Sequence, residues 1–343
     1  MTEKSATIEP PPMQPPSAQP QRLGLRVPKV TLGSGVGLIV IFVLVVVIFS
    51  RLTPLFLTTR NLLLLLQSVA VLGMIAVFST MLMVGGGLDL SVGATTALVG
   101  VTIAVLQKTI PIGEAVTVGL LIGLAIGLIN GLLVTQIGIN ALITTLGMLS
   151  VVRGLAFVVS GGIGVPILNI GFLQLGGGKI DGIPIPVIVM AILFIVAAII
   201  MQFTTYGRAM YAIGGNNRAS YLAALPVKRY QMTAYLLSAM SAAVAGVFLI
   251  SRQGAASPND SNGFELSVVA AVILGGTSLS GGKGNLFGTL IGVLILGTLS
   301  DGMTLLSVNA YYQQITLGVV LLLAVGLDQL RIGNLGRFFR SKY

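Results

Sequence analysis

The sequence predicts an all-α protein that crosses a membrane about ten times, with both its N-terminus and its C-terminus in the cytoplasm. Composition is the first observation behind this prediction. Of the 343 residues, 55% are apolar and 8% are charged, whereas a soluble domain carries about 25% charged residues. The second observation is a series of apolar runs near the ~20 residues that a membrane helix needs. The third is a bias of Lys and Arg toward one side of these runs.

Ten apolar runs divide the chain into predicted membrane segments. Their approximate bounds are 32–50, 61–84, 90–107, 115–136, 139–160, 184–203, 231–251, 264–280, 285–303 and 311–327. The third, eighth, ninth and tenth runs are short or interrupted by glycine, so tilted or broken helices are expected there. The fourth run carries glycine at every fourth position, and these residues share one helix face suited to close packing: Gly119, Gly123, Gly127 and Gly131.

The Lys and Arg residues between the runs indicate the orientation. With the N-terminus inside, thirteen of the 19 basic residues lie in cytoplasmic segments and five lie outside, while Arg153 falls within a segment. Residues 1–31 are proline-rich and polar and are expected to form a disordered cytoplasmic tail. The membrane domain then covers 32–327, including a cytoplasmic loop at 204–230, and a basic cytoplasmic tail follows at 328–343.

Several function classes are excluded by residue types that the chain lacks. It has no cysteine and no histidine, so disulfides, thiolate catalysis and histidine-based metal or acid–base sites cannot form. No close pair of carboxylates lies within a predicted membrane segment either. We therefore expect no catalytic residue, no metal site and no enzyme activity. The net charge of +10 reports membrane topology rather than nucleic-acid binding, because no basic run is interleaved with aromatic residues.

The loop at 204–230 contains a candidate docking helix. Its two adjacent glycines are predicted to form a flexible turn, and one of the two asparagines that follow is predicted to cap a helix at 218–225. The helix should stop before the proline. It serves either as a docking element for a partner or as a basic segment that fixes topology or rests on lipid headgroups. The residues concerned are Gly214, Gly215, Asn216, Asn217, Arg218, Ala219, Tyr221, Leu222, Leu225 and Pro226.

Polar residues inside the predicted helices are candidates for a substrate path or for a helix break. Three glycines in "MVGGGLDLSVGA" at 83–94 are predicted to break the second helix. Asp89 and Ser91 suit the start of the next helix, and an intramembrane carboxylate usually has a function. Capping by Asp89 is the favoured interpretation, and lining of a polar path is the other.

Arg153 is the clearest intramembrane charge, and it is predicted to pair with Asp89 or Asp301 or to contact a polar substrate. Other polar groups nearby either line the path or form hydrogen bonds between helices. The candidates are Asn130, Asn140 and Thr144.

The stretch "GGTSLSGGKG" at 275–284 has the composition of a phosphate-binding loop. The loop pattern G-x-x-x-x-G-K-[ST] needs a glycine where Thr277 stands and a hydroxyl where Gly284 stands. Its flanks are also membrane helices rather than a strand and a soluble helix. The stretch is therefore predicted to be a tight cytoplasmic turn, and no nucleotide site is expected in this chain.

Five blocks of the sequence, in this order, resemble a known family. They are "GGLDLSVGA", "LGMLSVVRGLAFVVSGG", "YGRAMYAIGGNNRASYLAAL", "GGTSLSGGKGNLFGTLIG" and "YYQQITLGVVLLLAV". From about residue 38 to residue 330, the chain is similar to the permease subunits of ribose-type ATP-binding-cassette (ABC) sugar importers. These include ribose, xylose, galactose, arabinose and autoinducer-2 permeases. The blocks are specific for the family rather than for one sugar.

The resemblance implies a multi-pass protein of the bacterial inner membrane that carries a monosaccharide, such as a ribose-like pentose. ATP and magnesium would be held by a separate ATPase subunit with two fused nucleotide-binding domains, so this chain would need no cofactor. A periplasmic sugar-binding protein would deliver the substrate, and a second permease copy or a paralogue would complete the path. The resemblance also assigns the segment 214–226 to contact with the ATPase.

The alternative function is a secondary transporter or facilitator for a small polar solute. Coupling to an ion gradient usually needs titratable groups inside the helix bundle. Only Asp89 and Asp301 qualify in this sequence. Transport in vesicles that lack an ATPase would favour this alternative.

Overall fold

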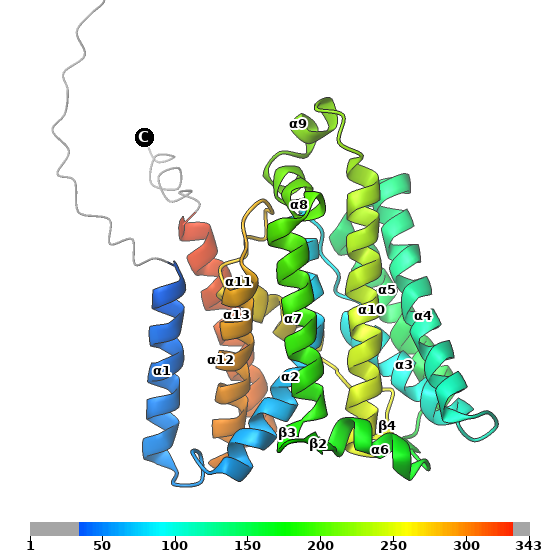
Figure 1. Cartoon of the computed structure of the whole chain (residues 1–343), viewed down its shortest axis with the longest axis vertical. Helices are drawn as coiled ribbons and strands as arrows, with labels where there is room; N and C mark the ends of the chain where they lie inside the picture. The colour runs from blue at the N-terminus through cyan, green and yellow to red at the C-terminus, as the bar shows by residue number, and fades with distance from the viewer. Residues whose placement is uncertain (1–33, 332–343) are drawn as a thin grey trace, which may run out of the picture. The chain divides into compact units, whose positions relative to one another are not determined.

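The computed structural model describes residues 34–331, and most of them are helical (Figure 1). The predicted N-terminal tail at 1–31 lies outside this range, as do residues 332–343 of the predicted C-terminal tail. Within the range, the predicted runs correspond to α1 (Ser34–Leu52), α2 (Thr59–Val84), α3 (Val92–Leu106), α4 (Ile112–Leu132), α5 (Ala141–Ser160), α7 (Ile185–Phe203), α10 (Val227–Gln253), α11 (Phe264–Leu274), α12 (Leu286–Leu305) and α13 (Ala310–Arg331). A short π-helical turn, η1 (Leu133–Ile137), continues α4.

The helices have the length and composition of a membrane protein. Six of them are long and apolar enough to cross a membrane, namely α2, α4 with η1, α5, α7, α10 and α12, while α1, α3, α11 and α13 supply shorter apolar stretches. The described residues form only two-residue strands, which are β1 (Val165–Pro166), β2 (Lys179–Ile180), β3 (Ile183–Pro184) and β4 (Ala255–Ala256). The prediction of an all-α, polytopic membrane protein is therefore confirmed.

Smaller elements lie at two opposite ends of the helices (Figure 1). One end, called the α6 end, carries α6 (Ile170–Gly177) and the antiparallel pairs β1–β4 and β2–β3. The other, called the α8 end, carries α8 (Thr205–Gly215), α9 (Asn217–Leu222) and the loop at 275–285. At the α6 end, the Gly176 amide donates to the hydroxyl of Ser251 at 2.6 Å, and the Gln67 side chain donates to the Gly176 carbonyl oxygen. These bonds hold α6 across α2 and α10.

Two parts of the chain repeat one arrangement in opposite directions. After α2 reaches the α8 end, the segment 85–91 turns back and the short α3 runs to the α6 end. After α10 reaches the α6 end, the segment 254–263 turns back and the short α11 runs to the α8 end. The starts of the two short helices share the pattern "DLSV" at 89–92 and "ELSV" at 265–268. Inverted repeats with interrupted helices are a common design of transporters.

Some helices differ from the expectation in length or continuity. The run predicted at 264–280 ends as α11 after 11 residues, because Gly276 adopts a φ of +91° and redirects the chain. Tilted or broken helices were expected in the tenth and ninth runs, but the tenth forms the unbroken 22-residue helix α13. The ninth forms the unbroken 20-residue helix α12. Its Gly288 and Gly292 do not interrupt it. They let α12 lie directly against the backbone of α11 at Gly275 and Ala271.

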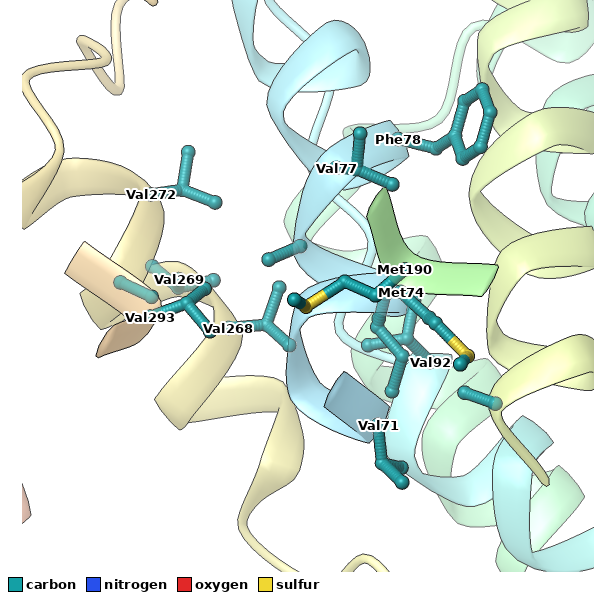
Figure 2. Close-up of a cluster of buried hydrophobic side chains, with 14 of the residues drawn as sticks. Val71, Met74, Val77, Phe78, Val92, Met190, Val268, Val269, Val272 and Val293 are labelled. Carbon is teal, nitrogen blue, oxygen red and sulfur yellow. The ribbon is translucent and has the colours of Figure 1, made fainter. Parts of the chain in front are cut away.

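The core is built around α2, in which nearly all residues from Val69 to Val84 are buried. Figure 2 shows valine and methionine side chains of α2 beside Val268 and Val272 of α11 and Met190 of α7. Because the same packed cluster holds α2 and α11, it fixes the break that follows α2 and the first turns of α11 relative to each other.

The glycine face of α4 packs as predicted. Gly119 lies against α3, and the other three glycines lie against α10, with all four buried. At Gly127, an added Cβ would come within 2.9 Å of the Tyr235 carbonyl oxygen and 2.8 Å of the Ala239 Cβ. No side chain fits there unless the two helices separate.

Gly127→Ala is therefore expected to lower the thermal unfolding midpoint of the detergent-solubilised protein, with a loss of roughly 1–3 kcal/mol as for other overpacked sites. Gly147→Ala in α5 is the matched control, because no atom lies within 4 Å of a Cβ added at Gly147. The control should unfold at or slightly above the wild-type temperature, because alanine is favoured over glycine in a helix by about 1 kcal/mol. Equal midpoints for the two variants would contradict the close packing of α4 on α10.

Candidate functional site

The predicted docking segment forms α9 and the end of α8, at the α8 end of the molecule. The predicted flexible turn at Gly214 and Gly215 is wrong, because both residues belong to the last turn of α8. Gly214 is held in that turn by direct contact with the backbone at Val84 and Gly282. The predicted helix cap is confirmed for Asn216, whose Oδ1 accepts a hydrogen bond of 2.9 Å from an amide in the first turn of α9.

The helix α9 is shorter than the predicted 218–225, since it ends at Leu222. Ala224 adopts a left-handed φ of +60°, and the Leu225 amide donates to the Ser220 carbonyl oxygen at 3.1 Å. Pro226 then prevents the helix from continuing. The chain therefore turns sharply after α9 and enters α10.

The side chains of α9 divide into an exposed pair and an anchored part. Tyr221 is 70% exposed and Leu222 is 74% exposed, so two large apolar groups project from the α8 end. Leu225, another of the candidate docking residues, packs inward against Ile213 and Val227. The remaining candidates on α9 itself, Asn217, Arg218 and Ala219, are exposed.

Backbone contacts tie α8 to the break after α2 and to the turn between α11 and α12. The Gly282 amide donates to the Val84 carbonyl oxygen at 2.8 Å, and Gly214 lies against both groups. The Tyr211 hydroxyl of α8 donates to the Gly284 carbonyl oxygen at 2.9 Å. A tyrosine is protonated at neutral pH because its usual pKa is about 10, and burial raises the pKa of Tyr211 further. A displacement of α8 would therefore be passed to the end of α2 and to the turn that joins α11 to α12.

Three of the polar path candidates meet at the break between α2 and α3. Asp89 Oδ1 accepts hydrogen bonds from the Ser91 amide at 2.9 Å and from the Ser91 hydroxyl at 2.6 Å. Asn130 of α4 donates from Nδ2 to the Ser91 hydroxyl at 2.9 Å. All three residues are buried. Asp89 therefore orients Ser91, the residue that precedes α3, but neither side chain accepts a hydrogen bond from an amide in the first turn of α3, so the favoured interpretation of a helix cap is not met. Asp89 Oδ2 and Asn130 Oδ1 are buried and have no hydrogen-bond partner among the described residues.

Arg153 lies apart from this cluster. Its Nη1 donates to the backbone carbonyl oxygens of Pro258 at 2.7 Å and Asp260 at 2.8 Å. The predicted pairing with Asp89 or Asp301 is not found. The physical reason is that the non-helical segment 254–263 exposes carbonyl groups inside the bundle, and the guanidinium group satisfies them.

The last two path candidates, Asn140 and Thr144, also lie apart from the cluster around Asp89. Asn140 is exposed and caps the start of α5, accepting from the Leu142 amide at 2.9 Å. Thr144 is buried one turn later, and its hydroxyl has no hydrogen-bond partner among the described residues. Neither residue contributes to the cluster around Asp89.

A model of the family described as the permease component of branched-chain amino acid transport systems matches residues 61–325. The chain belongs to this permease family. No solved structure gives a significant match to it.

Named relatives of the permease include three sugar permeases. The ribose import permease of Bacillus subtilis (strain 168) is 42% identical over 84% of this chain and 90% of that protein. The L-arabinose ABC transporter permease of Azospirillum brasilense is 41% identical, over 86% and 87% of the two chains. The ribose import permease of Escherichia coli (strain K12) is 40% identical, over 85% and 92%. The resemblance stated from the sequence blocks is confirmed, and the permease is a multi-pass protein of the inner membrane.

Two cavities of the permease meet at the start of α11, and sequence reasoning did not identify them as a site. The first has a volume of about 420 Å³, and its polar lining is Ser68, Arg252, Ser267, Ser300, Asp301 and Thr304. The second has a volume of about 620 Å³, and its polar lining is Asn262, Glu265, Ser267, Gln313 and Gln314. The repeat of "DLSV" as "ELSV" is the sequence signal that could have identified the start of α11.

Proposed function

We propose that this permease is the membrane-spanning subunit of an ABC importer that carries a monosaccharide into the cell. The observation that carries this proposal is the exposed pair Tyr221 and Leu222 on α9. Large apolar side chains at a cytoplasmic protein surface suit burial in the groove of a partner. The backbone contacts of α8 with Val84 and Gly282 then link this docking element to the membrane helices.

The proposed orientation places the α8 end in the cytoplasm. The segments 204–230 and 275–285 at that end carry Lys and Arg but no Asp or Glu, as expected for cytoplasmic loops. Eight helices then cross the membrane fully, while α3, with 15 residues, crosses about three quarters of it and α11 crosses about half. A helix of 11 residues such as α11 is about 16 Å long, against about 30 Å of hydrocarbon. The extended segments before α3 and α11 complete these two passes, giving ten passes with both ends inside.

The proposed partner of α9 is an ATPase subunit with two fused nucleotide-binding domains. ATP and magnesium would bind to that subunit, since the stretch 275–284 lacks the glycine and the hydroxyl of a phosphate-binding loop. Closure of the ATPase would pull on Tyr221 and Leu222 and so displace α8. The α6 end would face the periplasm and receive a sugar-binding protein, and a second permease copy or a paralogue would lie beside this chain.

The substrate class is proposed from the names of the relatives. The three relatives named above are ribose or L-arabinose permeases, whereas the family description refers to branched-chain amino acids. Identities near 40% over most of both chains support a sugar, with a ribose-like pentose as the first choice.

Reconstitution in vesicles tests the proposal. The permease would be purified with its ATPase subunit and its binding protein, and the uptake of radiolabelled ribose, L-arabinose and leucine would be measured with and without ATP. ATP-dependent uptake of a sugar is the expected result. Uptake that proceeds without the ATPase would show a facilitator or secondary transporter, and uptake of leucine alone would overturn the assignment of a sugar.

A further inference from the structure

We propose that the first of the two cavities binds one phospholipid whose headgroup carries a phosphate and a primary ammonium, in the leaflet at the α6 end. This cavity, called the lipid groove below, has a volume of about 420 Å³ and is lined mainly by α2 and α12. Arg252 and Asp301 would hold the headgroup, and apolar side chains would hold an acyl chain. Such a site does not depend on the proposed transport function, because it concerns only the contact between the permease and its membrane.

The lipid groove runs lengthwise along two antiparallel helices. Its main lining residues on α2 and on α12 are four positions apart and so share one face of each helix. They are Leu64, Ser68 and Leu72 of α2 and Leu296, Ser300 and Thr304 of α12. A helix rises about 12 Å over eight residues, so the groove has the length of a large part of an acyl chain. Leu64 is 48% exposed, which leaves the groove open to the surroundings.

Polarity changes along the groove in the order in which a phospholipid presents its parts. α2 begins at the α6 end and α12 ends there (Figure 1). The charged groups are near that end, with Arg252 in the last turn of α10 and Asp301 close to the end of α12. Leu72 and Leu296 line the groove farther from that end. A lipid in this leaflet has its headgroup at the helix ends and its acyl chains in the hydrocarbon layer, so both parts meet matching walls.

The two charged side chains are available to a ligand. Arg252 is exposed, and no described residue bonds to its guanidinium group. Asp301 accepts a hydrogen bond from Asn61 at 2.8 Å through Oδ2, which leaves Oδ1 for another donor. A phosphate would satisfy the guanidinium group and an ammonium would satisfy the carboxylate. A headgroup with a phosphate alone would meet the like charge of Asp301 and leave this carboxylate without a partner.

Hydroxyl groups beside Asp301 favour a primary ammonium over a trimethylated one. Ser68 donates its proton to the Leu65 carbonyl oxygen at 2.8 Å, and Thr304 donates to the Ser300 carbonyl oxygen at 2.8 Å. The lone pairs of both hydroxyl oxygens therefore remain as acceptors. A primary ammonium carries three N–H donors, whereas a trimethylated nitrogen carries none. Phosphatidylethanolamine has the required phosphate and primary ammonium with no further charge.

Native mass spectrometry of the delipidated permease in detergent tests the site. The protein would be titrated with phosphatidylethanolamine, phosphatidylcholine and phosphatidylglycerol of identical acyl chains, and its unfolding midpoint would be measured with each lipid. Arg252→Gln and Asp301→Asn each remove one charge, and asparagine keeps an acceptor for Asn61. Lys179→Gln is the matched control, because Lys179 is exposed on β2 at the same end and does not line the groove.

The wild type is expected to bind one phosphatidylethanolamine at least about tenfold more tightly than either other lipid, and this lipid should raise the unfolding midpoint. Arg252→Gln and Asp301→Asn should each weaken that binding about tenfold, whereas the control should bind as the wild type does. Asp301→Asn should also bind phosphatidylglycerol more tightly than the wild type, since the like charge is gone. Equal binding of the three lipids, or wild-type binding by both groove variants, overturns the site.

A second copy of the permease is the other possible occupant of the groove. Leu64→Cys distinguishes the two occupants, because the chain has no cysteine of its own. With phosphatidylethanolamine in the groove, oxidation of the Leu64→Cys variant should give no disulfide between copies. A disulfide-linked dimer that binds no phosphatidylethanolamine would assign the groove to contact between copies and overturn the lipid site.

Discussion

Leu222→Asp is expected to abolish ATP-dependent sugar uptake by the reconstituted importer while the permease itself still folds. Leu222 is 74% exposed, so a carboxylate costs the isolated chain little. In the complex, the same carboxylate would be buried in an apolar groove without a partner, which costs several kcal/mol. The measurement is the amount of ATPase that co-purifies with the variant, together with its uptake rate. Both should fall at least about tenfold, since 1.4 kcal/mol already corresponds to a factor of ten.

Ile180→Asp is the matched control for this prediction. Ile180 lies on β2 at the α6 end and is 54% exposed, so the substitution introduces the same charge at a similar apolar site far from α9. The ATPase should co-purify with this variant at the wild-type level. Wild-type association and uptake by Leu222→Asp would show instead that the segment 204–230 only sets the topology of the permease.

Gly214→Ala is expected to separate α8 from the end of α2 and to disable coupling. An added Cβ at Gly214 would collide with the Val84 carbonyl oxygen and the Gly282 amide. Because these are backbone atoms, they cannot move aside as a flexible side chain would. Either α8 shifts or the hydrogen bond between Gly282 and Val84 is lost. We expect a lower unfolding midpoint, with a loss of roughly 1–3 kcal/mol, and ATP hydrolysis that no longer drives uptake.

The neighbouring glycine provides the control. At Gly215, no atom lies within 4 Å of an added Cβ, and alanine is favoured over glycine in a helix by about 1 kcal/mol. Gly215→Ala should therefore match or slightly exceed the stability of the wild type and should transport normally. If the two alanine variants behave alike, the contact at Gly214 is not the link between α8 and the membrane helices.

The glycines show where sequence reasoning succeeds and where it stops. The spacing from Gly119 to Gly131 is regular, so the packing face of α4 could be read from the sequence alone. Gly214 and Gly215 form no such pattern, and their pairing suggested a turn. Only contacts with Val84 and Gly282, which are distant in the sequence, show that Gly214 is a packing site.

The polar candidates also divide into those that a local sequence signal reveals and those whose partners are distant in the sequence. Asp89 and Ser91 were recognised because they follow a local signal, three glycines that end a helix. Asn130 lies beside them only because α4 packs against the break between α2 and α3, which the sequence does not show. Arg153 was noticed as a charge, but its partners are backbone carbonyl groups of the segment 254–263, and no side-chain pattern reveals them.

The sequence by itself determined the all-α membrane class, the approximate helices and the family, because hydrophobic runs and local motifs are properties of neighbouring residues. The tertiary structure alone decided that the starts of α3 and α11 meet inside the bundle, since an added Cβ at Gly93 would touch the Glu265 carboxylate. It also decided which polar side chains surround the cavities at Phe264. Those groups come from α2, α10, α11, α12, α13 and the segment 254–263, and such a site exists only once distant parts of the chain pack together.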